Sequence, residues 1–198
     1  MADAATSLPE LEDMLQSVSA VNRPEILKHV VDLFLQNSDR LRPVHVEMFD
    51  AVISSLIADI ATESLVVLSK RIAGCDKVPT KIAMRLASDP NISVAEPMLL
   101  ESSRLTDAFL IDVAKTQGQM HILAVACRSQ VSAAVTDVII GRGDDVVVRY
   151  VVNNPGATFS DAGLLALVER SKGDAALAEQ LTHRHDIRGL KAKSRAAG

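Results

Sequence analysis

Aromatic residues are scarce in this sequence of 198 residues: they make up 3% of the chain, with no Trp and a single Tyr, Tyr150. A core without aromatic side chains must be filled by Leu, Ile, Val, Ala and Met, a composition often found in helical repeat proteins. The same scarcity removes the platforms on which the bases of single-stranded nucleic acids stack. The net charge of −4 provides no basic field either, which argues against nucleic acid or an anionic membrane as a partner.

Cysteine is also rare, and the two residues of this type, Cys75 and Cys127, lie far apart in apolar contexts. No CxxC or Cys–His spacing indicates zinc, so we expect both to be free, buried thiols in a reducing cytoplasm. The N-terminus, MADAATSLPELED, is acidic and lacks the form of a signal peptide. No apolar run approaches the roughly 18 residues that span a bilayer. We therefore predict a cytoplasmic protein that does not contact membranes.

Recognisable catalytic motifs are missing. The sequence contains no G-x-S-x-G, and GRGDD (141–145) lacks the Lys-Ser/Thr of a phosphate-binding loop. We expect Asp144 and Asp145 to cap a helix there. The densest cluster of possible metal ligands is HRHD, with His183, His185 and Asp186. No further ligand is apparent nearby to complete a zinc site, and we interpret the cluster as a polar turn. The sequence predicts no catalytic residue, no metal and no cofactor.

Helix signals are clear in the first half. The motifs SLPE (7–10) and NRPE (22–25) place a capping residue three positions ahead of a Glu, with an early Pro. The helix that starts at Pro43 carries an apolar stripe, and we expect Glu47, Asp50 and Ser54 on its opposite, polar side. Further helices are predicted near 62–73, over 79–88 and from Ser93, with Pro97 in the first turn of the last one.

The second half repeats itself. Long helices are predicted to begin at Thr106, Ser132 and Ser160, 26 and 28 residues apart, each preceded by an apolar residue as in a hydrophobic staple. They are predicted to end at Gly118, Gly143 and Gly173, because glycine is common just past a helix end. A shorter apolar segment follows each glycine. The period predicts alternating long and short helices.

The segment VVVRYVV (146–152) has the composition of a β-strand. Its apolar residues, however, repeat the spacing of the equivalent segments in the neighbouring copies, where AALAEQL strongly favours a helix. We therefore predict a helix here, with tertiary packing overriding the local β-propensity.

Together these signals predict an all-α fold, an α-solenoid of stacked short and long helix pairs resembling a HEAT or armadillo superhelix. We expect a single domain over residues 1–187, with 1–61 as a helical N-terminal cap and 62–187 as the repeats. The basic segment 188–198, which has no apolar period, is predicted to be a disordered tail.

Several stretches carry a family resemblance: LASDPNISVAEPMLLESSRLTD, HILAVACRSQVSAAVTDVIIGRGDDVV, NNPGATFS and LTHRHDI. In this order they resemble the bacterial family called domain of unknown function 2336, over most of residues 60–187. That family is similar to HEAT-like and leucine-rich-variant helical repeats, so the resemblance implies a helical solenoid. It implies no activity, substrate or catalytic residue.

Polar residues recur ten and eleven positions after each glycine. They are Arg128–Ser129, Asn153–Asn154 and His183–Arg184. From these, and with an Arg on the short valine-rich helix, our candidates for partner binding are Arg128, Arg149, Asn153, Asn154 and Arg184. If the helix pairs stack, such side chains form a ladder along one edge that can bind an extended peptide backbone. The alternative is that they satisfy carbonyl groups at the ends of the short helices.

The leading functional hypothesis is a non-catalytic scaffold or regulatory module that binds a protein or peptide on a solenoid face. One alternative is a HEAT-like protein that binds nucleic acid, although residues 100–187 hold 8 basic and 11 acidic groups. Another is a hydrolase, which would need His121, His183 or His185 beside a carboxylate in a cleft. Self-association into a homo-oligomer through exposed apolar helix faces at the N-terminal cap is the remaining alternative.

Overall fold

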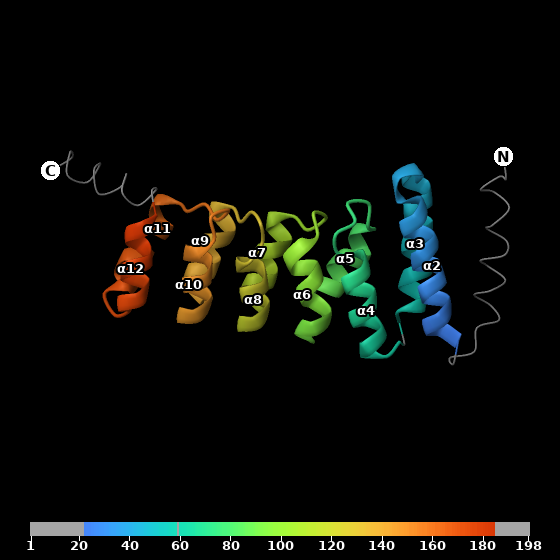
Figure 1. Cartoon of the computed structure of the whole chain (residues 1–198), viewed down its shortest axis with the longest axis horizontal. Coiled ribbons are helices and arrows are strands. Elements are labelled where there is room, and N and C mark those ends of the chain that lie inside the picture. The colour runs from blue at the N-terminus through green and yellow to red at the C-terminus, as the bar shows by residue number, and fades with distance from the viewer. Residues whose placement is uncertain (1–21, 59, 185–198) are drawn as a thin grey trace.

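The structure is a computed structural model that describes residues 22–58 and 60–184. Within them the fold is all-α, with eleven α-helices that follow one another along the long axis of the molecule (Figure 1). The elements are α2 (Arg23–Asn37), the short 3-10 helix η2 (Ser38–Arg40), α3 (Pro43–Leu56), α4 (Thr62–Ile72), α5 (Thr80–Ala87), α6 (Ile92–Glu101), α7 (Asp107–Thr116), α8 (Gln119–Ala126), α9 (Ala133–Arg142), α10 (Asp145–Asn153), α11 (Asp161–Ser171) and α12 (Ala175–His183).

The helices form two layers. In one layer the even-numbered helices pack in sequence, α2 on α4, α4 on α6, and so on to α12. In the other layer α3 packs on α5, and α7, α9 and α11 pack on one another. Neighbouring helices of the two layers also contact each other, for example α5 with α6 and α11 with α12. Each helix is therefore held both by its chain neighbour and by the helix one pair away.

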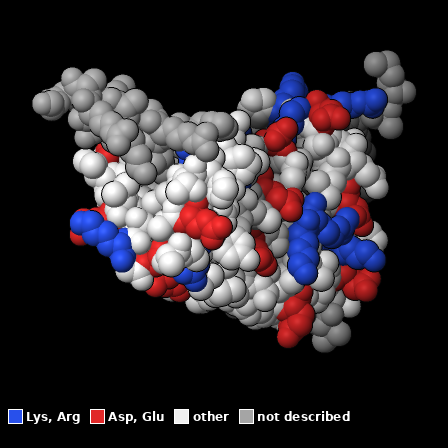
Figure 2. Space-filling model, turned by 60° about the vertical axis from the view of Figure 1, so that its left-hand side comes forward, with Lys and Arg blue, Asp and Glu red and all other residues white. Residues whose placement is uncertain are grey.

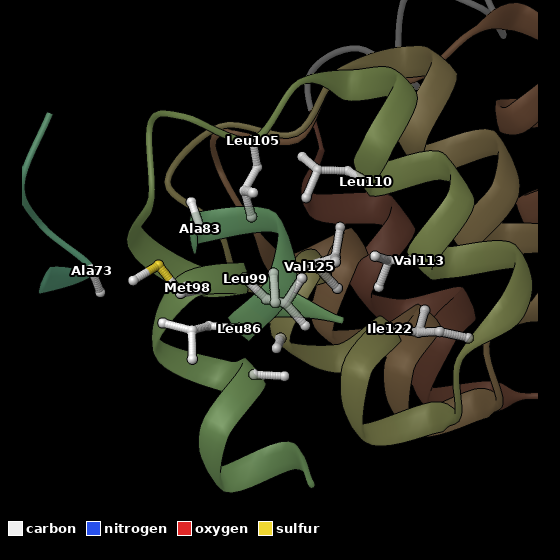
Figure 3. Close-up of a cluster of buried hydrophobic side chains, with 14 of the residues drawn as sticks. Ala73, Ala83, Leu86, Met98, Leu99, Leu105, Leu110, Val113, Ile122 and Val125 are labelled. Carbon is white, nitrogen blue, oxygen red and sulfur yellow. The ribbon is translucent and has the colours of Figure 1, made fainter. Parts of the chain in front are cut away.

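One hydrophobic cluster runs between the layers from Leu27 to Leu181. It consists almost entirely of Leu, Ile, Val and Ala, as the composition predicts, with Phe34 as its one fully buried aromatic residue. Figure 3 shows its centre, where Leu86 of α5 and Leu99 of α6 lie near Val125 of α8. Truncating such a residue to Ala costs about 2–5 kcal/mol of stability, so this cluster is the main source of cohesion.

The valine-rich segment is helical, which confirms the prediction. Helix α10 buries Val147, Val148, Val151 and Val152 against the core. The carboxylate of Asp144 caps the helix by accepting a hydrogen bond from the Val147 amide at 2.9 Å. Four buried β-branched side chains on one face thus outweigh the local preference for a strand.

The predicted starts of the long helices are confirmed, because Thr106, Ser132 and Ser160 are the N-cap residues of α7, α9 and α11. The predicted role of the glycines is only partly right. Gly143 is the C-cap of α9, whereas α7 and α11 end before Gly118 and Gly173, and none of the described glycines has a positive φ. After α7 and α9 the chain continues in extended backbone, and after α11 Lys172 keeps right-handed helical dihedral angles, so no left-handed turn is needed.

Three details of the first half differ from expectation. Helix α6 begins one residue earlier than predicted, because the side chain of Asn91 caps it by accepting from the Ser93 amide at 3.0 Å. Pro97 therefore lies inside α6 and not in its first turn. Asp50, expected on a polar surface, is only 9% exposed because α5 and the segment before it cover that side of α3. The predictions for SLPE (7–10) and the basic tail fall outside the described residues.

Two further observations concern the surface. Cys75 and Cys127 are free thiols, as predicted, but Cys127 is exposed because it follows the last residue of α8, where the chain leaves the core. Desolvation and the nearby Glu96 raise the pKa of the Cys127 thiol, which keeps it in its unreactive form. Among the helices of the described ranges, none has the length and apolar character needed to cross a bilayer.

Candidate functional site

The predicted polar edge residues Arg128, Asn154 and Arg184 form a ladder along one edge of the even-numbered layer. They follow α8, α10 and α12, and each reaches back to the end of the preceding even-numbered helix. The guanidinium of Arg128 donates to the carbonyls of Leu99 and Ser102, at 2.5 and 2.8 Å, where α6 ends. Carbonyls at a helix C-terminus have no partner within their own helix, and a cation there is also attracted by the negative end of the helix dipole.

Asn154 makes the middle step of this ladder. Its amide nitrogen donates to the carbonyls of Ala126 and Arg128 at 2.8 and 2.7 Å, and its amide oxygen accepts from the Gly156 amide at 2.8 Å. The backbone at Gly156 therefore packs directly against the segment between α8 and α9. A Cβ at this position would be 1.9 Å from the Ser129 carbonyl oxygen, so only glycine fits.

Arg184 makes the last described step. It donates to the carbonyls of Val152, Asn154 and Ala157 at 2.9, 3.0 and 2.9 Å. Its guanidinium also lies over the Phe159 ring, 4.5 Å from the centroid. The alternative that these side chains satisfy carbonyls at the ends of the short helices is thus confirmed. Partner binding by the same residues stays a prediction.

A second ladder, which the sequence analysis missed, runs through the odd-numbered layer. Arg85, Arg142 and Arg170 lie in the last turns of α5, α9 and α11. Arg85 binds the carbonyls of Ser54 and Ile57, Arg142 those of Ala114 and Lys115, and Arg170 those of Ile140 and Gly143. The sequence does contain a signal for this ladder, because an Arg recurs in the last turn of the long helices. Our prediction rested on the glycines near these Arg residues and not on the Arg residues themselves.

Arg149 is engaged in a salt bridge. Its guanidinium is 2.6 Å from a carboxylate oxygen of Asp174, the N-cap residue of α12. The hydrogen bond from the Leu177 amide and the contact with Arg149, opposed by desolvation, hold the pKa of the Asp174 carboxyl below its usual value. Arg149 therefore joins α10 to the start of α12, and part of it remains accessible, since 32% of its side chain is exposed.

The outer side of α10 exposes a stripe that nothing in the described chain covers. Val146, Arg149, Tyr150 and Asn153 are spaced as i, i+3, i+4 and i+7, which places them on one side of the helix. Val146 is 48% and Tyr150 54% exposed, and Met120, at the equivalent position of neighbouring α8, is 57% exposed. We call these five residues the α10 face. Asn153 is exposed, and its side chain makes no hydrogen bond with the described residues.

The histidines do not form a catalytic group in the described part of the chain. His121 is buried, and its Nε2 atom lies 2.9 Å from the backbone carbonyl oxygen of Asp89, not from a carboxylate. His183 ends α12 at the surface, while His185 and Asp186 lie outside the described residues. No group of three His, Cys, Asp or Glu able to hold a metal ion occurs within 22–58 and 60–184.

Charges of both signs are mixed on the surface. Figure 2 shows basic and acidic side chains beside one another, separated by uncharged areas, and no continuous positive groove on the face in view. This distribution gives the nucleic-acid alternative no support, because such binding needs a basic track along the backbone phosphates.

A family model described as an uncharacterised protein conserved in bacteria, DUF2336, matches residues 94–193, a range that begins inside α6 and includes both the ladder around Asn154 and the α10 face. Among curated proteins and among solved structures, nothing matches the chain.

Proposed function

This chain belongs to the bacterial family DUF2336, and within that family we propose that it is a non-catalytic module that binds a protein or peptide partner. The observation that carries the proposal is the α10 face, an exposed apolar and aromatic stripe bordered by polar side chains. Tyr, Met and Arg are enriched in protein interfaces relative to the rest of the surface. A face with this composition fits another protein better than it fits a small molecule.

The same proposal includes the finer architecture, an α-solenoid of HEAT-like helix pairs with α2 and α3 as its N-terminal cap. The two layers and the two ladders support this interpretation, since each helix pair is tied to the preceding pair at equivalent positions. Solenoids offer extended surfaces on which a partner can lie across several helices. The α10 face would be one part of such a surface.

Of the five predicted binding residues, we assign direct contact to two. Asn153 has an unused amide, and Arg149 is partly exposed beside Tyr150. Arg128 and its counterparts in the ladder, Asn154 and Arg184, would support the surface by holding successive helix ends in place. Rigid support of this kind limits the entropy that an interface loses on binding.

The test is capture of partners from a lysate of the native organism, with identification by mass spectrometry. A double variant, Val146→Ser with Tyr150→Ser, removes the apolar part of the α10 face. The matched control is Leu165→Ser with Val168→Ser, which changes two residues of α11 that are 63% and 42% exposed. We expect a partner that wild type and control retain and the α10 variant loses.

Equal retention by the three proteins would place the interface elsewhere and contradict the proposal. Light scattering at several concentrations shows whether the captured partner is a second copy of this chain. A mass that grows with concentration in wild type but not in the α10 variant would identify self-association as the interaction.

A further inference from the structure

A groove of about 740 Å³ lies between α3 and α5, at the opposite end of the described helices from α12. Its walls come from α3, from the segment between α4 and α5, from the start of α5 and from Arg104. Pockets of roughly 300–1,000 Å³ commonly hold drug-sized ligands, so this volume suits a short stretch of polypeptide. The groove is separate from the α10 face.

Asp50 lies in the wall of this groove, in the interior of α3. Only 9% of the residue and 13% of its side chain are exposed, and its Oδ1 atom is buried without a hydrogen-bond partner. Its Oδ2 atom is 3.7 Å from the Lys81 ammonium, beyond hydrogen-bond distance. The Lys81 side chain is 88% exposed, so this contact is a loose one.

Three other Asp side chains, by contrast, have internal partners. Asp144 and Asp174 cap helices, and Asp76, also in the groove, accepts a hydrogen bond from Ser103 at 2.8 Å. Asp50 neither caps a helix nor accepts a hydrogen bond from any described residue. A buried carboxylate with one oxygen lacking a hydrogen bond costs stability, and the loose ion pair with the exposed Lys81 ammonium offsets this cost only in part. Ser69, Ser132 and Gln180 also hold a buried atom without a hydrogen bond, but Asp50 is the carboxylate among them and lies in the wall of a groove, which makes it a candidate to bind a cationic ligand.

The other charged side chains of the groove indicate which kind of ligand it can bind. Lys77 already donates to the Asp39 carbonyl at 2.8 Å, and Arg104 donates to the Thr80 hydroxyl at 2.9 Å. Both side chains keep their positive charge, so with Lys81 they balance the carboxylates of Glu47, Asp50 and Asp76 in the groove. The charged groups of the groove that lack a hydrogen bond to a described residue are the carboxylates of Asp50 and Glu47, one turn apart on α3, and the loosely held Lys81. Two acceptors beside the apolar side chains of the groove favour a cation on an aliphatic stem.

We propose that this groove binds an arginine side chain of a partner polypeptide, with its guanidinium on Asp50 and Glu47 in place of Lys81. Arginine fits better than lysine because its planar fork donates to two acceptors at once. Pro43, Val46 and Pro79 line the groove where the aliphatic stem would lie. The inference rests on the proposed function, since its ligand belongs to a partner protein.

The test is an NMR titration of the isotope-labelled full chain with the peptide acetyl-Gly-Arg-Gly-amide. The same peptide with citrulline, the neutral isostere of arginine, is the ligand control. We expect saturable shifts of amides in α3 and the first turn of α5 with the arginine peptide, and none with citrulline. Asp50→Asn is expected to weaken binding about tenfold or more, since a charge-assisted pair is lost.

Two further variants complete the design. Asp112→Asn makes the same change at an exposed position of α7 and should bind like wild type. Lys81→Gln removes the competing cation and should bind the peptide more tightly. If the site instead prefers anions, Lys81→Gln will weaken binding of inorganic phosphate, and that result overturns the inference.

Absence of shifts in wild type, equal binding of citrulline, or unchanged binding by Asp50→Asn would also overturn it. Thermal melting checks that Asp50→Asn is folded, and Tm should not fall, because the buried charge that is removed has only a loose ion pair and no hydrogen bond. The outcome is independent of the α10 face. A failed titration together with partner loss in the α10 variant rejects the groove and keeps the proposed function, and the opposite pair of results rejects the α10 face.

Discussion

The polar side chains at the ends of the C-terminal helices and those in the groove between α3 and α5 are bonded differently. From α7 to α12, the side chains at the helix ends bind carbonyls of the preceding helix pair, in both layers. Between α3 and α5, a groove remains open and the buried carboxylate of Asp50 lacks a hydrogen bond. The Arg and Asn side chains at these helix ends stabilise the stacking of successive helix pairs, whereas Asp50 forms no such bond.

Gly156→Ala should break the C-terminal arrangement most strongly. The added Cβ would overlap the Ser129 carbonyl oxygen, so the connection between α10 and α11 must move off its neighbour. We expect a loss of about 3 kcal/mol in the free energy of unfolding, measured by urea denaturation. Gly118→Ala is the control, because a Cβ there has nothing within 4 Å and its stability should change by less than about 1 kcal/mol. Equal effects of the two changes would contradict the close approach at Gly156.

Asn154→Ala should have the next largest effect. The change leaves the carbonyls of Ala126 and Arg128 and the amide of Gly156 without their side-chain partner. A loss of about 2 kcal/mol is expected from urea denaturation. The adjacent Asn153→Ala removes an exposed amide and should cost less than about 0.5 kcal/mol. A reversed order would mean that the ladder does not stabilise the stacking.

Arg170→Met tests the second ladder. The guanidinium binds two carbonyls at the end of α9 and the Asp145 carboxylate, so its loss should lower stability by about 1 kcal/mol. Lys172→Met removes only a surface ion pair with Glu169, whose two side chains are 68% and 72% exposed, and should have almost no effect. Thermal melting of both variants gives the comparison, and equal Tm values would reject the role of the odd-numbered ladder.

The fall in Tm at acidic pH should depend in part on Asp174. Because its folded pKa lies below the ordinary value of an Asp carboxyl, its contribution is present above that ordinary value and is lost as the pH falls through the folded pKa. Asp174→Asn should therefore flatten the fall of Tm between about pH 5 and pH 3, a window set by carboxyl titration. Wild type and variant curves of the same slope would show that the salt bridge with Arg149 contributes nothing.

Asp50→Asn should have the smallest effect on stability, and of the opposite sign. The variant removes a buried charge that lacks a hydrogen bond, so Tm is expected to stay the same or to rise. Asn154→Ala, in the C-terminal ladder, should by contrast lower Tm. A clear loss of stability in Asp50→Asn would give this carboxylate a structural role after all.

Much of the fold was predictable because it depends on local patterns. Apolar periodicity and N-cap residues located the helices from α2 to α12, and comparison of equivalent segments identified α10 as a helix against its β-propensity. The helix ends were less predictable. The glycines suggested where the helices end, whereas carbonyls at these ends are bound by arginines that follow about 30 residues later in the chain, and the partners in such a long-range contact cannot be read from a local pattern.

The candidate site was predictable in position but not in role. The recurrence of Arg128, Asn154 and Arg184 correctly indicated a ladder along one edge. Whether their side chains donate to the protein's own carbonyls or to a partner depends on how closely the segments between successive helices stack, which the sequence does not give. Asp50 was misplaced for a related reason. Helical periodicity gives the side of α3 on which it lies, but not that α5 returns to cover that side.

Site-specific photo-crosslinking tests the central claim, that partners bind the α10 face, most directly. A benzophenone-bearing phenylalanine replaces Tyr150 in one variant and Leu165, an exposed residue of α11, in the other. After irradiation in the native lysate, we predict a covalent adduct with the partner from position 150 and none from position 165. An adduct formed only from position 165, or from neither position while the partner is still captured, would contradict the account.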